Sequence, residues 1–89
     1  MKALVTVVGQ DRVGIIGGVC TKLAEFGINI LDISQTVMQE FFTMMMIVDL
    51  SGADASFDII SQMLETYGQN QELQIRIQRT DIFDTMHKI

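Results

Sequence analysis

The chain has 89 residues, of which 48% are hydrophobic, no proline, and a formal net charge of −5 at pH 7. This length predicts a single domain with one modest core. The acidic balance and the absence of a basic run argue against nucleic acid or a membrane surface as the main partner, because both attract clustered Lys and Arg. A single cysteine, Cys20, excludes a disulfide framework and a thiolate metal cluster.

The N-terminal apolar run ends at Gly9 and is too short for a signal peptide. No apolar stretch approaches the roughly 18 residues that cross a bilayer. We therefore expect a soluble, cytoplasmic domain, and no motif in it requires a cofactor or a metal.

The first third of the chain predicts a strand followed by a helix. Residues 3–8, "ALVTVV", are apolar at both parities, as expected of a central strand with two buried faces. Asp11 stands where an N-cap belongs, with the helix beginning near Val13, and Gly27 is a natural helix end. Helical spacing joins the apolar residues between them, which are Ile16, Val19, Cys20, Leu23 and Phe26.

The middle of the chain predicts two strands joined by a tight turn. Residues 28–38 follow period two but change phase, which predicts a bulge near Leu31 and Asp32. Gln39 and Glu40 then turn the chain into "FFTMMMIVDL", a strand that is apolar on both faces.

The last third predicts a helix, a strand and a tail. Loop residues 52–56 lead into a helix with Phe57, Ile60, Leu64 and Tyr67 at helical spacing, and Gly68 is its predicted end. Residues 73–79, "LQIRIQR", alternate as a half-buried strand does. The final ten residues carry Ile82, Phe83, Met86 and Ile89 on one side of a predicted short helix.

The order of these elements is typical of a ferredoxin-like α+β sandwich, βαββαβ. We expect a four-stranded antiparallel sheet with two helices on one face and a short C-terminal helix. Residues 1–89 form one domain, with a core over 1–79 and an amphipathic tail over 80–89.

Two helices cover only one face of such a sheet, so apolar residues remain on the other. If Met44, Met46 and Val48 face the helices, the opposite face carries Phe41, Met45 and Ile47, with Leu4 and Val8 nearby. An apolar patch of this size usually marks an interface. We expect the tail residues Ile82, Phe83 and Met86, a second subunit, or both, to cover it.

Several functions fit the stretch "VVGQDRVGIIGGV" (7–19) poorly. Ile15 and Ile16 stand where a phosphate-binding loop needs Lys and Ser or Thr. An RNA-recognition domain has the same strand order, but its Lys/Arg-Gly-Phe signature is missing. A small acylphosphatase-like hydrolase could use Arg12 and Asn29, although no nucleophile stands beside a base. The only histidine, His87, lies in the tail, and Cys20 lies on an apolar helix stripe.

A helix N-terminus that holds an anion fits this stretch better. Its unpaired N–H groups suit a carboxylate, and Gly14 would let a ligand approach the backbone. Asp11 could accept a hydrogen bond from the ammonium group of the same ligand, a combination matched to an amino acid. The alternative is that Asp11 only caps the helix and Gly14 only makes room for packing.

At the same residues the chain resembles an ACT domain, the small regulatory module of amino-acid metabolism. The matching pieces are the loop G-x-D-R-x-G-I, residues 9–15, and G-x-N-I, residues 27–30. The similarity runs to residue 79 and is strongest to stand-alone bacterial ACT proteins, the kind that includes the glycine-cleavage repressor. Many relatives have proline where this chain has Val13.

The resemblance implies a non-catalytic protein that forms a homodimer or a higher oligomer and senses a small amino acid between subunits. It implies a ligand held by one chain's first loop and by the other chain's second strand. The implied ligand residues are Asp11, Arg12, Val13, Gly14 and Ile15 of one chain, and Asn29 and Ile30 of the other. Some ACT domains only dimerise, so a ligand-free module that binds a regulated protein partner stays open.

Overall fold

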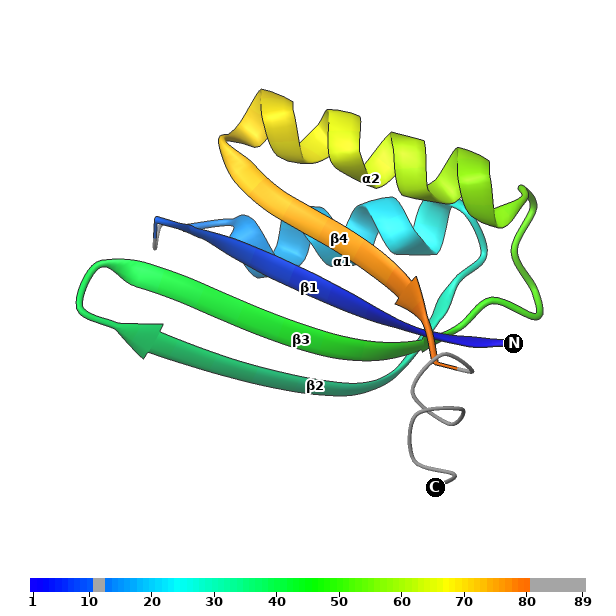
Figure 1. The fold of residues 1–89 in the computed structure, drawn as a ribbon, viewed down its shortest axis with the longest axis horizontal. Helices are drawn as coiled ribbons and strands as arrows, with labels where there is room; N and C mark the ends of the chain where they lie inside the picture. Colours follow the sequence, from blue (N-terminus) through cyan, green and yellow to red (C-terminus); the bar gives the residue numbers. More distant parts are fainter. Residues whose placement is uncertain (11–12, 81–89) are drawn as a thin grey trace, which may run out of the picture.

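The computed structural model describes residues 1–10 and 13–80, which form a four-stranded antiparallel sheet and two helices (Figure 1). The strand order is β2-β3-β1-β4, so the predicted ferredoxin-like fold is confirmed. The tail helix predicted after residue 80 lies outside the described residues. The elements in chain order are β1 (Lys2–Gln10), α1 (Ile15–Glu25), β2 (Asn29–Met38), β3 (Phe41–Asp49), α2 (Phe57–Gln71) and β4 (Leu73–Arg79).

The core lies between the helices and one face of the sheet. β1 and β3 are the two central strands, as their apolar character at both parities predicts, and the predicted set Met44, Met46 and Val48 is completely buried. The helices contribute apolar residues spaced three and four apart, since one stripe of each helix faces the sheet. These residues are Ile15, Val19 and Leu23 from α1 and Ile60 and Leu64 from α2.

α1 begins later than the sequence predicts. Its first residue is Ile15 and its N-cap is Gly14, so the predicted start near Val13 with Asp11 as N-cap is wrong. Gly14 has φ 93°, a left-handed conformation that glycine adopts without a steric penalty, and no side chain caps it. The shift also changes the buried stripe, because Ile15 is buried while Ile16 is 36% exposed.

α1 ends at Glu25, and the predicted glycine follows its C-cap residue Phe26. Gly27 has φ 73°, and its N–H donates to the Ala24 carbonyl while that of Ile28 donates to the Leu23 carbonyl. This is the Schellman motif, which satisfies the last carbonyls of a helix. A Cβ on Gly27 would lie 2.6 Å from the carbonyl oxygen of Gly52, so glycine also permits the close contact with the β3–α2 loop.

α2 does not end at Gly68 as predicted but continues to Gln71. The hydroxyl of Ser56 caps the start of α2 by accepting from the Ile59 N–H at 3.4 Å. Gly68 is buried inside α2, where an added Cβ would lie 2.7 Å from the carbonyl oxygen of Leu73. This glycine therefore serves the packing of α2 against β4, while Glu72, with φ 58°, forms the C-cap.

The predicted bulge in β2 is confirmed. Ile30 pairs with Val48, but the next pair is Asp32 with Ile47, so Leu31 is the extra residue. After the bulge Ile33 pairs with Met46. Because paired residues share a face, the bulge keeps Ile30 and Ile33 on the helix side of the sheet.

Candidate functional site

The turn between β1 and α1 forms the first half of the predicted site. The first N–H groups of a helix have no partner within the helix, and α1 has no acidic residue in its first turn. A Cβ built on Gly14 or Gly17 would meet no atom within 4 Å, so the space beside this helix start is open. A helix start is a place where backbone N–H groups can bind an anion.

The other predicted residues of this loop differ in exposure. Val13 is fully exposed, whereas the Ile15 side chain is buried in the core and can offer a ligand only its backbone. Asp11 and Arg12 lie outside the described residues, so their predicted ligand contacts stay predictions.

Asn29 and Ile30 begin β2 and form the second half of the predicted site. Asn29 is exposed and pairs with Asp49 of β3, while Ile30 is half-buried against the core. The Asp54 N–H donates to the Phe26 carbonyl at 3.0 Å, and this bond joins the turn before β2 to the β3–α2 loop. The turn that precedes Asn29 is therefore held in place by a hydrogen bond to the β3–α2 loop.

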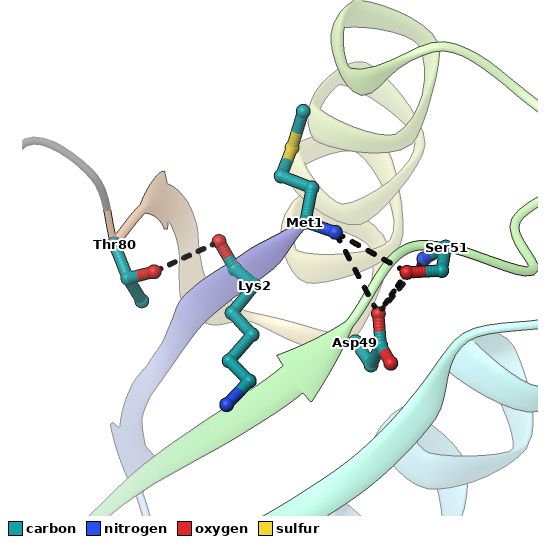
Figure 2. Close-up of polar contacts among 5 residues, drawn as sticks. All are labelled: Met1, Lys2, Asp49, Ser51 and Thr80. Atoms are coloured by element: carbon teal, nitrogen blue, oxygen red, sulfur yellow. Dashed lines mark hydrogen bonds and ion pairs between the residues drawn. The ribbon is translucent and has the colours of Figure 1, made fainter.

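A polar cluster around Asp49 lies at the end of β3 (Figure 2). Asp49 pairs with Asn29 of β2. The Asp49 carboxylate accepts from the Ser51 hydroxyl at 2.6 Å and from the Ser51 N–H at 2.9 Å. The amino group of Met1 donates to the Ser51 hydroxyl oxygen and lies 3.8 Å from the carboxylate. The two bonds from Ser51, with the nearby cations, hold the pKa of Asp49 below its ordinary value of 3.8.

Within one chain the two halves of the predicted site lie at opposite ends of the sheet (Figure 1). Gln10, the last residue of β1, pairs with Phe41 at the start of β3. Asn29 pairs with Asp49, which lies at the other end of β3 and pairs with Lys2. One chain alone therefore does not bring the loop and Asn29 together.

The predicted apolar face of the sheet is present. We call it the open face and define it by Leu4, Val8, Phe41, Met45 and Ile47, which lie on the side opposite the helices. Phe41 is 50% and Met45 45% exposed. A shallow groove of about 160 Å³ lies on this face, and the lining residues that belong to the face are Leu4, Asp32, Ser34, Met45 and Ile47. The tail residues Ile82, Phe83 and Met86, predicted to contact it, lie outside the described residues.

A further exposed apolar surface lies on the edge strand β2, where the sequence interpretation placed none. Ile33 and Val37 pair with the buried residues Met46 and Phe42 and so lie on the helix side, yet they are 41% and 52% exposed. The strand order already predicts β2 as an edge, and the two residues share one parity, so this signal was present in the sequence. β2 thus carries apolar side chains beside an unpaired strand edge.

The described residues contain no group of three His, Cys, Asp or Glu side chains that could hold a metal ion. Across the same ranges, neither helix is both long enough and apolar enough to span a membrane.

Comparison with known proteins identifies the family. A family model described as "ACT domain" matches residues 2–78. The chain belongs to the ACT domain family. The ACT domain is a regulatory fold whose members commonly form oligomers and bind amino acids.

Relatives of the same length are similar to the whole chain. A UPF0237 protein of Clostridium acetobutylicum is 52% identical over 89 residues, which is 100% of both chains. The solved structure of an ACT domain protein from Streptococcus pneumoniae has a TM-score of 0.84 at 48% identity and covers 93% of each chain.

A third solved structure is similar to this chain and carries the description of a regulator. A protein described as a glycine cleavage system transcriptional repressor has a TM-score of 0.78 at 28% identity. The match covers 89% of this chain and 45% of that one. This chain is thus similar to one part of a longer protein whose description is that of a regulator.

Proposed function

We propose that this ACT domain protein is non-catalytic, assembles into a homodimer, and senses a small amino acid at the subunit boundary. The observation that carries the proposal is the separation of the two predicted half-sites. The β1–α1 turn offers backbone N–H groups at one end of the sheet, and Asn29 lies at the other end. Both halves serve one ligand only when a second chain supplies one of them.

The β1–α1 turn suits the carboxylate of an amino acid. The start of α1 carries about half a positive charge, and the left-handed Gly14 places no Cβ in front of its N–H groups. Asp11 is the predicted acceptor for the ammonium group, with Arg12 beside it in the sequence. A carboxylate and an ammonium group on one small molecule would then be bound by groups of opposite charge.

Pairing of two β2 strands would bring the half-sites together. β2 is ten residues long, exposed along its edge, and carries Ile33 and Val37, whereas the other edge strand, β4, has seven residues and exposes Gln74, Arg76 and Gln78. Charged and short edges resist pairing, and long apolar edges favour it. We therefore place the second copy at β2.

An antiparallel register centred on Gln35 makes β2 self-complementary. Ile33 of one copy then lies opposite the partner's Val37 on the helix side, and the only charged residue of the strand, Asp32, lies opposite the partner's Met38. Such apolar cross-strand pairs are stabilising, and no like charges meet. Because the strands run in opposite directions, Asn29 reaches the end of the assembled sheet where the partner's β1–α1 turn lies.

Calorimetry with serine, glycine and the branched and aromatic amino acids tests ligand sensing, after a thermal-shift panel of all twenty. A ligand at 100 times its Kd adds about 2.7 kcal/mol of stability. Asn29→Ala should weaken binding at least about tenfold, because a lost hydrogen bond to a charged ligand costs about 1.5–3 kcal/mol. Asn70→Ala is the matched control, since Asn70 is exposed in α2.

If the wild type binds no amino acid at millimolar concentration, ligand sensing is wrong. The open face, with Phe41 and Met45 half exposed, would then favour the second candidate, an assembly module that contacts a regulated protein. The hydrolase hypothesis has less support, because Asn29 lies at the opposite end of the sheet from Gln10 and Val13, which flank Arg12. Turnover of an acyl phosphate would revive it.

A further inference from the structure

We propose that residues 81–89 dock on the open face of their own subunit and cover it. Docking of this segment goes beyond amino-acid sensing and does not depend on it. The occupant is the chain's own C-terminal segment, which we call the tail, and not a second copy or another protein.

The open face has the arrangement of apolar and polar residues that is typical of a surface covered by a partner. Most of its central residues are apolar and lie on β1 and β3, where Leu4 pairs with Ile47, and Met45 pairs with Thr6. Polar residues border it on both sides, since Arg76 of β4 pairs with Thr6 and Asp32 of β2 pairs with Ile47. An apolar centre with a polar rim is typical of an interface.

The chain leaves the sheet beside this face. Thr80 follows β4, and both its N–H and its hydroxyl donate to the Lys2 carbonyl at 3.2 Å (Figure 2). Leu4 and its partner Ile47, which line the groove on the open face, lie two residues farther along the sheet from Lys2. The tail therefore starts at the end of the sheet where the groove lies.

The tail is long enough to cross the face. β4 and β3 are separated by two strand spacings, or about 10 Å. Nine residues span about 13 Å as a helix and up to about 30 Å when extended. The tail can thus reach from Thr80 over β1 to Met45 and Ile47 of β3.

The side chains of the tail match the face in polarity and in charge. Its apolar residues are Ile82, Phe83, Met86 and Ile89. Its first half carries Asp81 and Asp84, and its second half carries Lys88. In the proposed docking the two acidic residues would face Lys2 and Arg76, and Lys88 would face Asp32 across the sheet. Opposite charges at the two ends fix one direction of docking.

The tail lies outside the residues that match the ACT domain family model, but inside the alignment with a relative of the same length. The family model ends at residue 78, whereas the relative from Clostridium acetobutylicum aligns through all 89 residues. The tail is therefore shared with this relative and lies beyond the residues matched by the family model.

Methionine methyl NMR on the full chain tests the proposal, because neighbouring methionines report on opposite faces of the sheet. Met45 lies on the open face, while Met44 and Met46 are buried on the helix side. A nitroxide attached to His87→Cys, which leaves Lys88 and the apolar tail residues in place, should broaden the Met45 methyl signal more than the other two in a Cys20→Ala background. The dispersed signals of Met44 and Met46 verify that the variant is folded.

A mixed sample separates docking within a chain from exchange between chains. Isotope-labelled chains without nitroxide are combined with unlabelled chains that carry it. The proposal is supported if the Met45 signal broadens when the isotope label and the nitroxide are on the same chain, and does not broaden in the mixed sample. Broadening in the mixed sample, or equal broadening of all three methionines, overturns it. A nitroxide at Asn70→Cys on α2 is the control, and it should not broaden the Met45 signal more than those of Met44 and Met46.

Discussion

Gly17 and Gly68 both lie inside helices, but the space around them differs. A Cβ on Gly17 would meet no atom within 4 Å, whereas a Cβ on Gly68 would lie 2.7 Å from the Leu73 carbonyl oxygen. Gly17→Ala should therefore raise the free energy of unfolding by about 0.5–1 kcal/mol, because alanine favours a helix. Gly68→Ala should lower it by about 1–3 kcal/mol through overpacking.

Denaturant unfolding of the two variants measures both signs in one experiment. Each is the same chemical change in a helix, so the variants are controls for each other. If Gly68→Ala is as stable as the wild type, the close approach of α2 to β4 is not as tight as described.

The Asp49 carboxylate gives the protein a pH-dependent contribution to stability. Because folding lowers its pKa, the folded state favours the ionised form, and this contribution is present above the ordinary pKa of 3.8. It is lost as the pH falls from 3.8 through the lower pKa of the folded state. Acid should therefore remove it, while alkali should not.

Asp49→Asn tests this contribution, because the amide keeps the shape and loses the charge. The variant should unfold at lower denaturant than the wild type at pH 7, and the difference should shrink below pH 3.8. A difference that stays constant over this range would contradict the role of the charge.

At the scale of the element, the edge of β2 carries a testable prediction. Ile33→Glu should convert the proposed homodimer into a monomer, because it places a charge on the exposed helix side of the proposed pairing surface. Ile59→Glu is the matched control, since Ile59 is 53% exposed on α2. Sedimentation at micromolar concentration measures the outcome.

The same experiment with Met45→Glu distinguishes the two apolar surfaces. If the open face is the dimer interface, Met45→Glu dissociates the protein and Ile33→Glu does not. A wild type that sediments as a monomer would contradict the homodimer itself.

Element order and strand faces could be read from the sequence, because both depend on local periodicity. The bulge at Leu31 was predicted from a change of phase alone. The end of α2 was not, because a glycine in a helix pattern means either a C-cap or a close contact, and only the position of β4 shows that Gly68 is the second. The start of α1 was missed for a related reason, since backbone conformation at Gly14 replaces a side-chain cap.

At the scale of the whole molecule, the sequence predicted which residues resemble a ligand site but not where they lie. Periodicity does not report that Asn29 and Gly14 are at opposite ends of one sheet, because that depends on the pairing of β2 with β3 and of β3 with β1. The register between the strands of two chains is even less predictable from the periodicity of one sequence. The parity of Ile33 and Val37 is visible in the sequence, but their 41% and 52% exposure depends on where the helices lie.

The contact of Thr80 with Lys2 places both ends of the described chain side by side, next to β1 and β4 and away from β2. A fusion that joins residue 80 of one copy to residue 1 of the next would therefore interrupt neither sheet. Each copy in such a fusion would keep its β2 edge free for pairing. The longer repressor chain, of which the match to this domain covers 45%, is long enough for two such domains.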